Sequence, residues 1–254
     1  MSDPVSGDGR TPPVLPATTG VDDAHAGESA VLTKTAAWED VLDIFYAPRA
    51  VFERRRDGKY LVPVIVLCLT TAVVFFLSRQ LNDVLQDVEF ARVIRQNGMT
   101  AEQAAAGRAM TKKVGELGIY LVPIFVAIGV WVTGTLIQIL GRAMGAKLNF
   151  AQGCTIAALS SLPELLGKVL VGTQAVFLDT ASVAHRHSFS ISVARFLPGD
   201  VSNWLLKFAA MIDPFVLWGA CLLGLGAYVI GGMEKEKAAV LAIILTLLTT
   251  VIAR

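Results

Sequence analysis

Five long apolar blocks separated by polar segments dominate the chain from Tyr60 to its last residues. At about 1.5 Å per residue, blocks of this length cross the roughly 30 Å hydrocarbon core of a bilayer as α-helices. The last block is the shortest, and Lys237 and Arg254 at its ends can extend their charged groups to the interfaces. We therefore predict an all-α, polytopic membrane helix bundle with amphipathic interfacial helices. The five transmembrane helices are expected at about residues 60–78, 117–141, 150–178, 213–233 and 237–253.

The chain changes character at about residue 37. Residues 1–36 are rich in Pro, Gly, Asp, Ser, Thr and Ala. Such a segment has too little apolar surface to offset the entropy of ordering, so we predict a disordered polar tail. Residues 37–254 then form the membrane domain.

A short amphipathic helix is predicted directly after the tail. Apolar residues recur at helical spacing from Trp38 to Phe45, acidic residues lie between them, and Pro48 interrupts the pattern. A basic cluster follows, and such a combination suits a membrane interface with anionic lipid headgroups or a cytoplasmic protein partner. The alternative is an elbow in water that packs on the bundle. The residues predicted to contact lipid or a partner are Trp38, Phe45, Arg54, Arg55 and Arg56.

Two longer polar segments are predicted to lie outside the bilayer. In residues 79–116, Asn97-Gly98 ends one helix, and Thr100 with Gln103 has the spacing of a capping box that opens a second. In the later segment, Ser188 to Val193 alternates polar and apolar residues, which indicates a strand that could pair with residues 180–184. An interfacial helix around Trp204 would then lead to the fourth span.

Composition supports a membrane protein and no nucleic-acid partner. The hydrophobic fraction is 54%, the charged fraction is 17% and the net charge is +1, against roughly 25% charged residues in a soluble domain. The three cysteines lie in or beside apolar blocks without metal-ligand spacing, so we interpret them as small buried hydrophobic residues. Lysine and arginine are densest before the first span and in two short loops, which predicts a cytoplasmic N-terminus and a C-terminus outside.

The order of several segments resembles the bacterial members of the Yip family, five-span proteins named for yeast relatives that interact with Rab-type GTPases. The resemblance covers roughly residues 38 to 252. It implies an all-helical membrane domain with a cytoplasmic N-terminus, here in a bacterial inner membrane. For eukaryotic members it implies roles in vesicle traffic. The segments that carry the resemblance are Phe45-Tyr46-Ala47-Pro48-Arg49-Ala50-Val51-Phe52-Glu53, Met99-Thr100-Ala101-Glu102-Gln103, Phe150-Ala151-Gln152 with Leu162-Pro163, Ile212-Asp213-Pro214-Phe215-Val216-Leu217-Trp218 and Leu223-Gly224-Leu225-Gly226.

The third apolar block contains a possible intramembrane polar centre. Glu164 and Lys168 lie four residues apart, hence on one helical face, and follow Pro163. A charge at bilayer depth costs roughly 3 kcal/mol on insertion scales, so such residues often line a path for protons, ions or substrates. The alternatives are an internal ion pair that orients the bundle, or a shifted span whose Lys168 reaches the interface.

The remaining polar features predict structure rather than chemistry. Asp213 and Pro214 have the pattern of an N-cap and a first helical residue. Ala220, Gly224 and Gly231 belong to a small-residue stripe suited to close helix packing. His185 and His187 lack further ligands nearby, so we expect no metal and no cofactor.

Two function hypotheses follow. No catalytic motif is present, so we expect no enzyme. The first hypothesis is a non-enzymatic membrane scaffold or adaptor involved in membrane organisation or trafficking. The second is a small transporter or channel that uses the polar centre of the third span.

Overall fold

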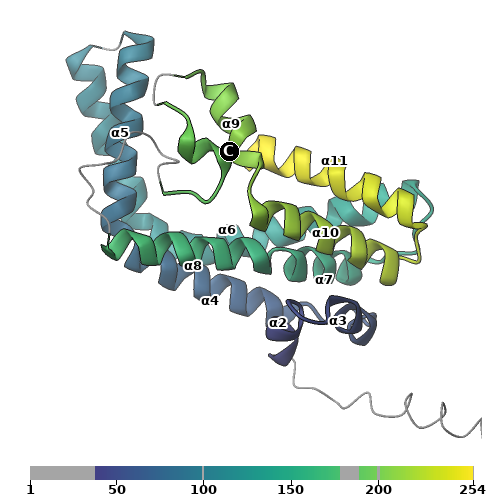
Figure 1. The fold of residues 1–254 in the computed structure, drawn as a ribbon. Helices are drawn as coiled ribbons and strands as arrows, with labels where there is room; N and C mark the ends of the chain where they lie inside the picture. Colours follow the sequence, from purple (N-terminus) through teal and green to yellow (C-terminus); the bar gives the residue numbers. More distant parts are fainter. Residues whose placement is uncertain (1–37, 99, 178–188, 199–200, 254) are drawn as a thin grey trace, which may run out of the picture. The chain divides into compact units, whose positions relative to one another are not determined.

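A computed structural model describes residues 38–98, 100–177, 189–198 and 201–253 (Figure 1). The predicted disordered tail, the two histidines and residues 180–184 therefore lie outside the described residues. The regular secondary structure of the described part is entirely helical and contains no strand, which confirms the all-α prediction for these ranges. The elements are α2 (Glu39–Asp43), α3 (Pro48–Arg54), α4 (Leu61–Leu77), α5 (Arg79–Asn97), α6 (Ala101–Ala143), α7 (Phe150–Ser160), α8 (Leu162–Phe177), the 3₁₀ helix η2 (Val193–Phe196), α9 (Asn203–Met211), α10 (Pro214–Val229) and α11 (Lys235–Ala253).

Two helical stretches are long and apolar enough to cross a membrane, Tyr120–Ala143 in α6 and Phe150–Gln174 in α7 and α8. Two further pairs qualify if each bent pair is one span: α4 with the start of α5, bent by 70°, and α9 with α10, bent by 61°. The described residues thus contain two to four candidate spans, fewer than the five predicted. The segment α11 is not among them, so the predicted fifth span at residues 237–253 is not confirmed.

The helical hairpin predicted between the first two spans is present, with one difference. Gly98 ends α5 in the left-handed conformation, at φ 60°, where the missing Cβ removes the steric penalty. Thr100 and Gln103 form the predicted capping box at the start of α6. However, α6 continues without a break for 43 residues, so the second arm of the hairpin and the second span are one helix.

The strand prediction is wrong in its described part. Residues 189–192 are turn and bend, the Oγ atoms of Ser190 and Ser192 lie 2.7 Å apart, and η2 begins at Val193. Phe189 is buried whereas Val193 is exposed, so the apolar residues of the alternating pattern do not share one buried face. Ala194 of η2 packs in a small cluster with Leu206 and Ala210 of α9.

The short helix α7 lies at the centre of the packing, against α6, α10 and α4. It approaches α6 closely: a Cβ on Gly153 would lie 2.2 Å from the carbonyl oxygen of Gly134. It also approaches α10, since a Cβ on Gly219 would lie 2.8 Å from the oxygen of Ser160. Small residues therefore bring three backbones together, as in other membrane helix interfaces. In the predicted stripe on α10, Gly224 instead faces Ala238 and Ala242 of α11.

Candidate functional site

The third span is broken at Ser161, next to the predicted polar centre. The Oγ of Ser161 donates to the carbonyl oxygen of Ala157 at 2.8 Å, and α8 begins at Leu162. Pro163 lies in the first turn of α8, where its missing N–H costs little. Glu164 is therefore the third residue of α8, in the first turn of the new helical segment.

Glu164 and Lys168 do not form the internal ion pair that was the alternative to a polar centre. The described residues contain no contact within salt-bridge distance between the two side chains, and both are exposed at the protein surface. Both nevertheless line two neighbouring cavities, of about 380 and 250 Å³. We call these two cavities together the third-span chamber. The residues that line both cavities are Thr71, Glu164, Lys168 and Val216.

The chamber lies where four helices meet. Its larger part is bounded by α4, the start of α5, α8 and the start of α10, and Asp213 is among its lining residues. The Oδ1 of Asp213 accepts a hydrogen bond of 2.8 Å from the N–H of Phe215, so the predicted N-cap is confirmed. The smaller part extends toward α6 and α11. The arrangement provides an anion, a cation and hydroxyl groups within an apolar wall.

A second polar cluster holds the segment before the first span together. We call this segment, residues 38–59 with the helices α2 and α3, the entry elbow. Asp40 is fully buried, and Arg54 contacts its Oδ1 at 2.8 Å through Nη2. The same Nη2 lies 2.6 Å from Oδ2 of Asp43, and Arg55 also binds Asp40. Burial by itself would lower the pKa of Arg54, but its hydrogen bonds to Asp43 and Asp40 outweigh burial and raise that pKa. Two of the three predicted lipid-binding arginines thus bind carboxylates within the elbow.

The entry elbow is docked on the bundle by one face. Phe45 packs edge-on against Trp218 of α10 with ring centroids 5.2 Å apart, and Phe52 is fully buried. Gln152 of α7 donates from Nε2 to the carbonyl oxygen of Arg56 at 2.9 Å, and the Arg56 side chain is exposed. Of the five residues predicted to contact lipid or a partner, Phe45, Arg54 and Arg55 instead contact other residues of the protein. Trp38 and Arg56 are exposed.

The outer face of the elbow is apolar. Trp38, Leu42 and Tyr46 are spaced four residues apart and expose 60%, 57% and 88% of their surface. The sequence pattern did not lead us to predict that Leu42 and Tyr46 share an exposed face with Trp38, or that Asp40 is buried. A signal was present, because Asp40 and the buried Ile44 share the four-residue spacing of one helical side.

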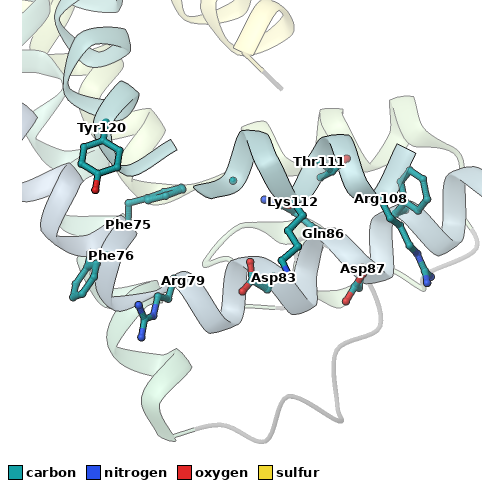
Figure 2. A pocket seen from close by; sticks show the side chains of 12 residues that line it. Phe75, Phe76, Arg79, Asp83, Gln86, Asp87, Arg108, Thr111, Lys112 and Tyr120 are labelled. Atoms are coloured by element: carbon teal, nitrogen blue, oxygen red, sulfur yellow. The ribbon is translucent and has the colours of Figure 1, made fainter. Parts of the chain in front are cut away.

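The hairpin of α5 and α6 also encloses a groove, of about 650 Å³ (Figure 2). Acidic residues on α5, Asp83 and Asp87, and basic residues on α6, Arg108 and Lys112, line it together with aromatic rings. All four charged residues are exposed. Mixed, exposed charges of this kind are typical of a solvated helix surface.

Comparison with known families agrees with this architecture. Helices apolar enough to span a membrane define an integral membrane protein. A model of the Yip1 domain matches residues 42–253, most of the chain, so the protein belongs to the Yip1 domain family. No curated protein and no solved structure matches the chain.

Proposed function

We propose that this Yip1 domain protein is a non-enzymatic membrane scaffold or adaptor with a role in membrane organisation or trafficking. The observation that supports the proposal best is the entry elbow. Ion pairs between Asp40 and two arginines fix it from inside, and Phe45 and Phe52 fix it to the bundle. A rigid elbow with an exposed apolar face is suited to present one surface to a partner, because little conformational entropy is lost on binding.

The proposed orientation places this surface in the bacterial cytoplasm, at the inner membrane, with the C-terminus outside. Exposed basic residues support it: Arg56 and Lys59 on the elbow and Lys237 at the start of α11. The partner is then a cytoplasmic or membrane protein that meets the elbow beside anionic lipid headgroups.

Site-specific photocrosslinking in native membranes tests the adaptor proposal. A benzophenone amino acid at Tyr46 should give a defined protein adduct, because Tyr46 is the most exposed of the large hydrophobic residues on the elbow. The matched control places the same group at Phe196, which is 82% exposed on η2, away from the elbow helices. Replacing Trp38 and Leu42 by serine should remove the adduct at Tyr46 without changing membrane insertion. Adducts with lipid alone at Tyr46 would contradict an adaptor role.

The third-span chamber supports a second candidate, a small transporter or channel. Its supporting observation is that Glu164 and Lys168 both line the two cavities and are not paired with each other. Flux of ions or small metabolites into proteoliposomes should then be lost in the Glu164→Gln, Lys168→Gln double variant. Absence of flux from wild-type proteoliposomes for every tested solute would eliminate this candidate.

A further inference from the structure

The third-span chamber combines opposite charges that are available to a ligand. Glu164 and Lys168 are one helical turn apart, about 6 Å along the axis, and both line each cavity. No ion pair joins them among the described residues. Opposite charges near a membrane interior normally pair, because isolation from water is costly for each. Their arrangement therefore leaves one anionic and one cationic position for a bound molecule.

Two buried hydroxyl groups in the chamber also lack partners. Ser78 lines the larger cavity and Ser160 lines the smaller one; both residues are more than nine-tenths buried. Neither Oγ atom has a hydrogen-bond partner. Buried polar atoms are nearly always hydrogen-bonded, so each orphaned hydroxyl indicates a group that binds there.

Hydroxyls elsewhere in the described helices show that this is not a general property of the fold. The hydroxyl groups of six described residues each donate a hydrogen bond to the carbonyl oxygen four residues earlier, which is the usual way to satisfy a hydroxyl in a helix. These six residues are Thr111, Thr135, Thr155, Ser161, Thr173 and Thr249. Ser78 and Ser160 do not adopt this solution, and both face the chamber.

The third charge of the chamber, Asp213, has a partner already. Its carboxylate caps α10 and accepts from the N–H of Phe215. The positive end of the α10 dipole offsets its charge. A ligand that meets Glu164 and Lys168 is therefore favoured when it carries one ammonium and one anionic group, because the site and ligand together then stay close to neutral.

We propose that the third-span chamber binds a zwitterion in which an ammonium and a phosphate are joined by a short linker, the chemistry of a phosphoethanolamine headgroup. The ammonium meets Glu164, the phosphate meets Lys168, and the Ser78 hydroxyl donates to a phosphate oxygen. The larger cavity, about 380 Å³, lies in the range of small-molecule sites, about 300–1,000 Å³. The proposal uses the chamber of the second candidate function but requires only binding, so a failed flux assay leaves it intact.

The ligand has two possible sources, a lipid or a soluble zwitterion. Exposed apolar side chains on the chamber helices suit the acyl chains of a lipid: Leu77 on α4, and Leu166 and Leu170 on α8. Calorimetry on the full-length protein in detergent separates the sources. The probes are dihexanoyl phosphatidylethanolamine, dihexanoyl phosphatidylglycerol, free phosphoethanolamine and inorganic phosphate.

The expected result is binding of phosphatidylethanolamine about tenfold tighter than of phosphatidylglycerol, which lacks the ammonium. Glu164→Gln and Lys168→Gln should each weaken binding about tenfold, and Ser78→Ala should weaken it about threefold. The matched control is the exposed pair Glu234 and Lys237, 3.3 Å apart in another part of the chain. Its glutamine variants should bind like wild type.

The competing outcomes are distinct. Free phosphoethanolamine binding as tightly as the lipid supports the same site chemistry with a soluble ligand. Equal binding of phosphatidylglycerol, no binding of either zwitterion, or chamber variants that bind like wild type would overturn the proposal. Gly172→Ala is a variant that leaves every charge in place: its Cβ would lie 2.8 Å from the Ser78 Oγ, so it should weaken binding while the melting temperature shows an intact fold.

Discussion

The second and third spans have similar apolar compositions but differ in how much of each is buried within the protein. Tyr120–Ala143 and Phe150–Gln174 are both long and apolar enough to cross a membrane. Only 17% of the apolar window is buried within the protein in the second, against 61% in the third. Phe125 and Ile139 of the second span are exposed, whereas Ile156 and Leu159 of the third are fully buried.

Hydropathy therefore does not distinguish an apolar helix that faces lipid from one that faces other helices of the protein. Lipid chains are about as apolar as leucine side chains, so a lipid-facing and a protein-facing helix have similar hydropathy. Small residues mark the protein-facing one: Gly153, Ala157 and Ala158 are buried in α7.

Truncation of a large side chain should separate the spans most strongly. Leu159→Ala removes a fully buried side chain from α7 and should destabilise the protein by about 3 kcal/mol through lost packing. Ile139→Ala in α6 removes a side chain that is mostly exposed and should cost less than about 1 kcal/mol. Unfolding in mixed micelles of increasing SDS content measures both. Equal costs would show that the second span is also covered by protein.

Added volume should have an intermediate effect. Gly153→Ala forces a Cβ against the backbone of Gly134 and should destabilise by about 2 kcal/mol through displacement of α6 from α7. Gly129→Ala is the matched control in α6, because a Cβ there meets nothing within 4 Å. Thermal unfolding followed by tryptophan fluorescence should show a lower midpoint for the first variant only. A lower midpoint for Gly129→Ala would contradict this expectation, because it would mean that the second span is in close contact with protein at Gly129.

Loss of one hydroxyl should have the smallest effect. Ser161→Ala removes the bond from Oγ to the carbonyl of Ala157 at the break of the third span and should cost about 1 kcal/mol. Thr135→Ala removes the corresponding bond to Trp131 in the second span and should change stability by less than about 0.5 kcal/mol. The same SDS titration tests the pair. A larger cost at Thr135 than at Ser161 would reverse the expected order.

Local signals in the sequence predicted local structure correctly. Thr100 with Gln103, Asn97-Gly98 and Asp213-Pro214 each predicted a helix end that the structure contains. Such ends depend on neighbouring residues only, so their patterns are readable in one chain. The strand prediction over Ser188 to Val193 failed in its described part because an alternating pattern over six residues does not ensure a pairing partner for the backbone.

The candidate sites were predictable in part. Glu164 and Lys168 were identified because charges are rare in apolar blocks. The partners of Arg54 and Arg55 were not, since Asp40 lies 14 and 15 residues away. Ser78 and Ser160 gave no signal either, because serine is common in membrane helices and only its surroundings reveal whether its hydroxyl has a partner.

The pattern of residues along the chain is enough to predict a helical membrane protein and the helix ends at Gly98, Thr100 and Asp213. Both properties follow from hydropathy and from short-range backbone hydrogen bonds. Three features became visible in the folded protein alone. The third span is the more buried of the two apolar helices. Arg54 and Arg55 bind Asp40, and Glu164 and Lys168 line a shared chamber without forming an ion pair. These depend on contacts between distant segments, and a one-dimensional pattern contains no record of which segments meet.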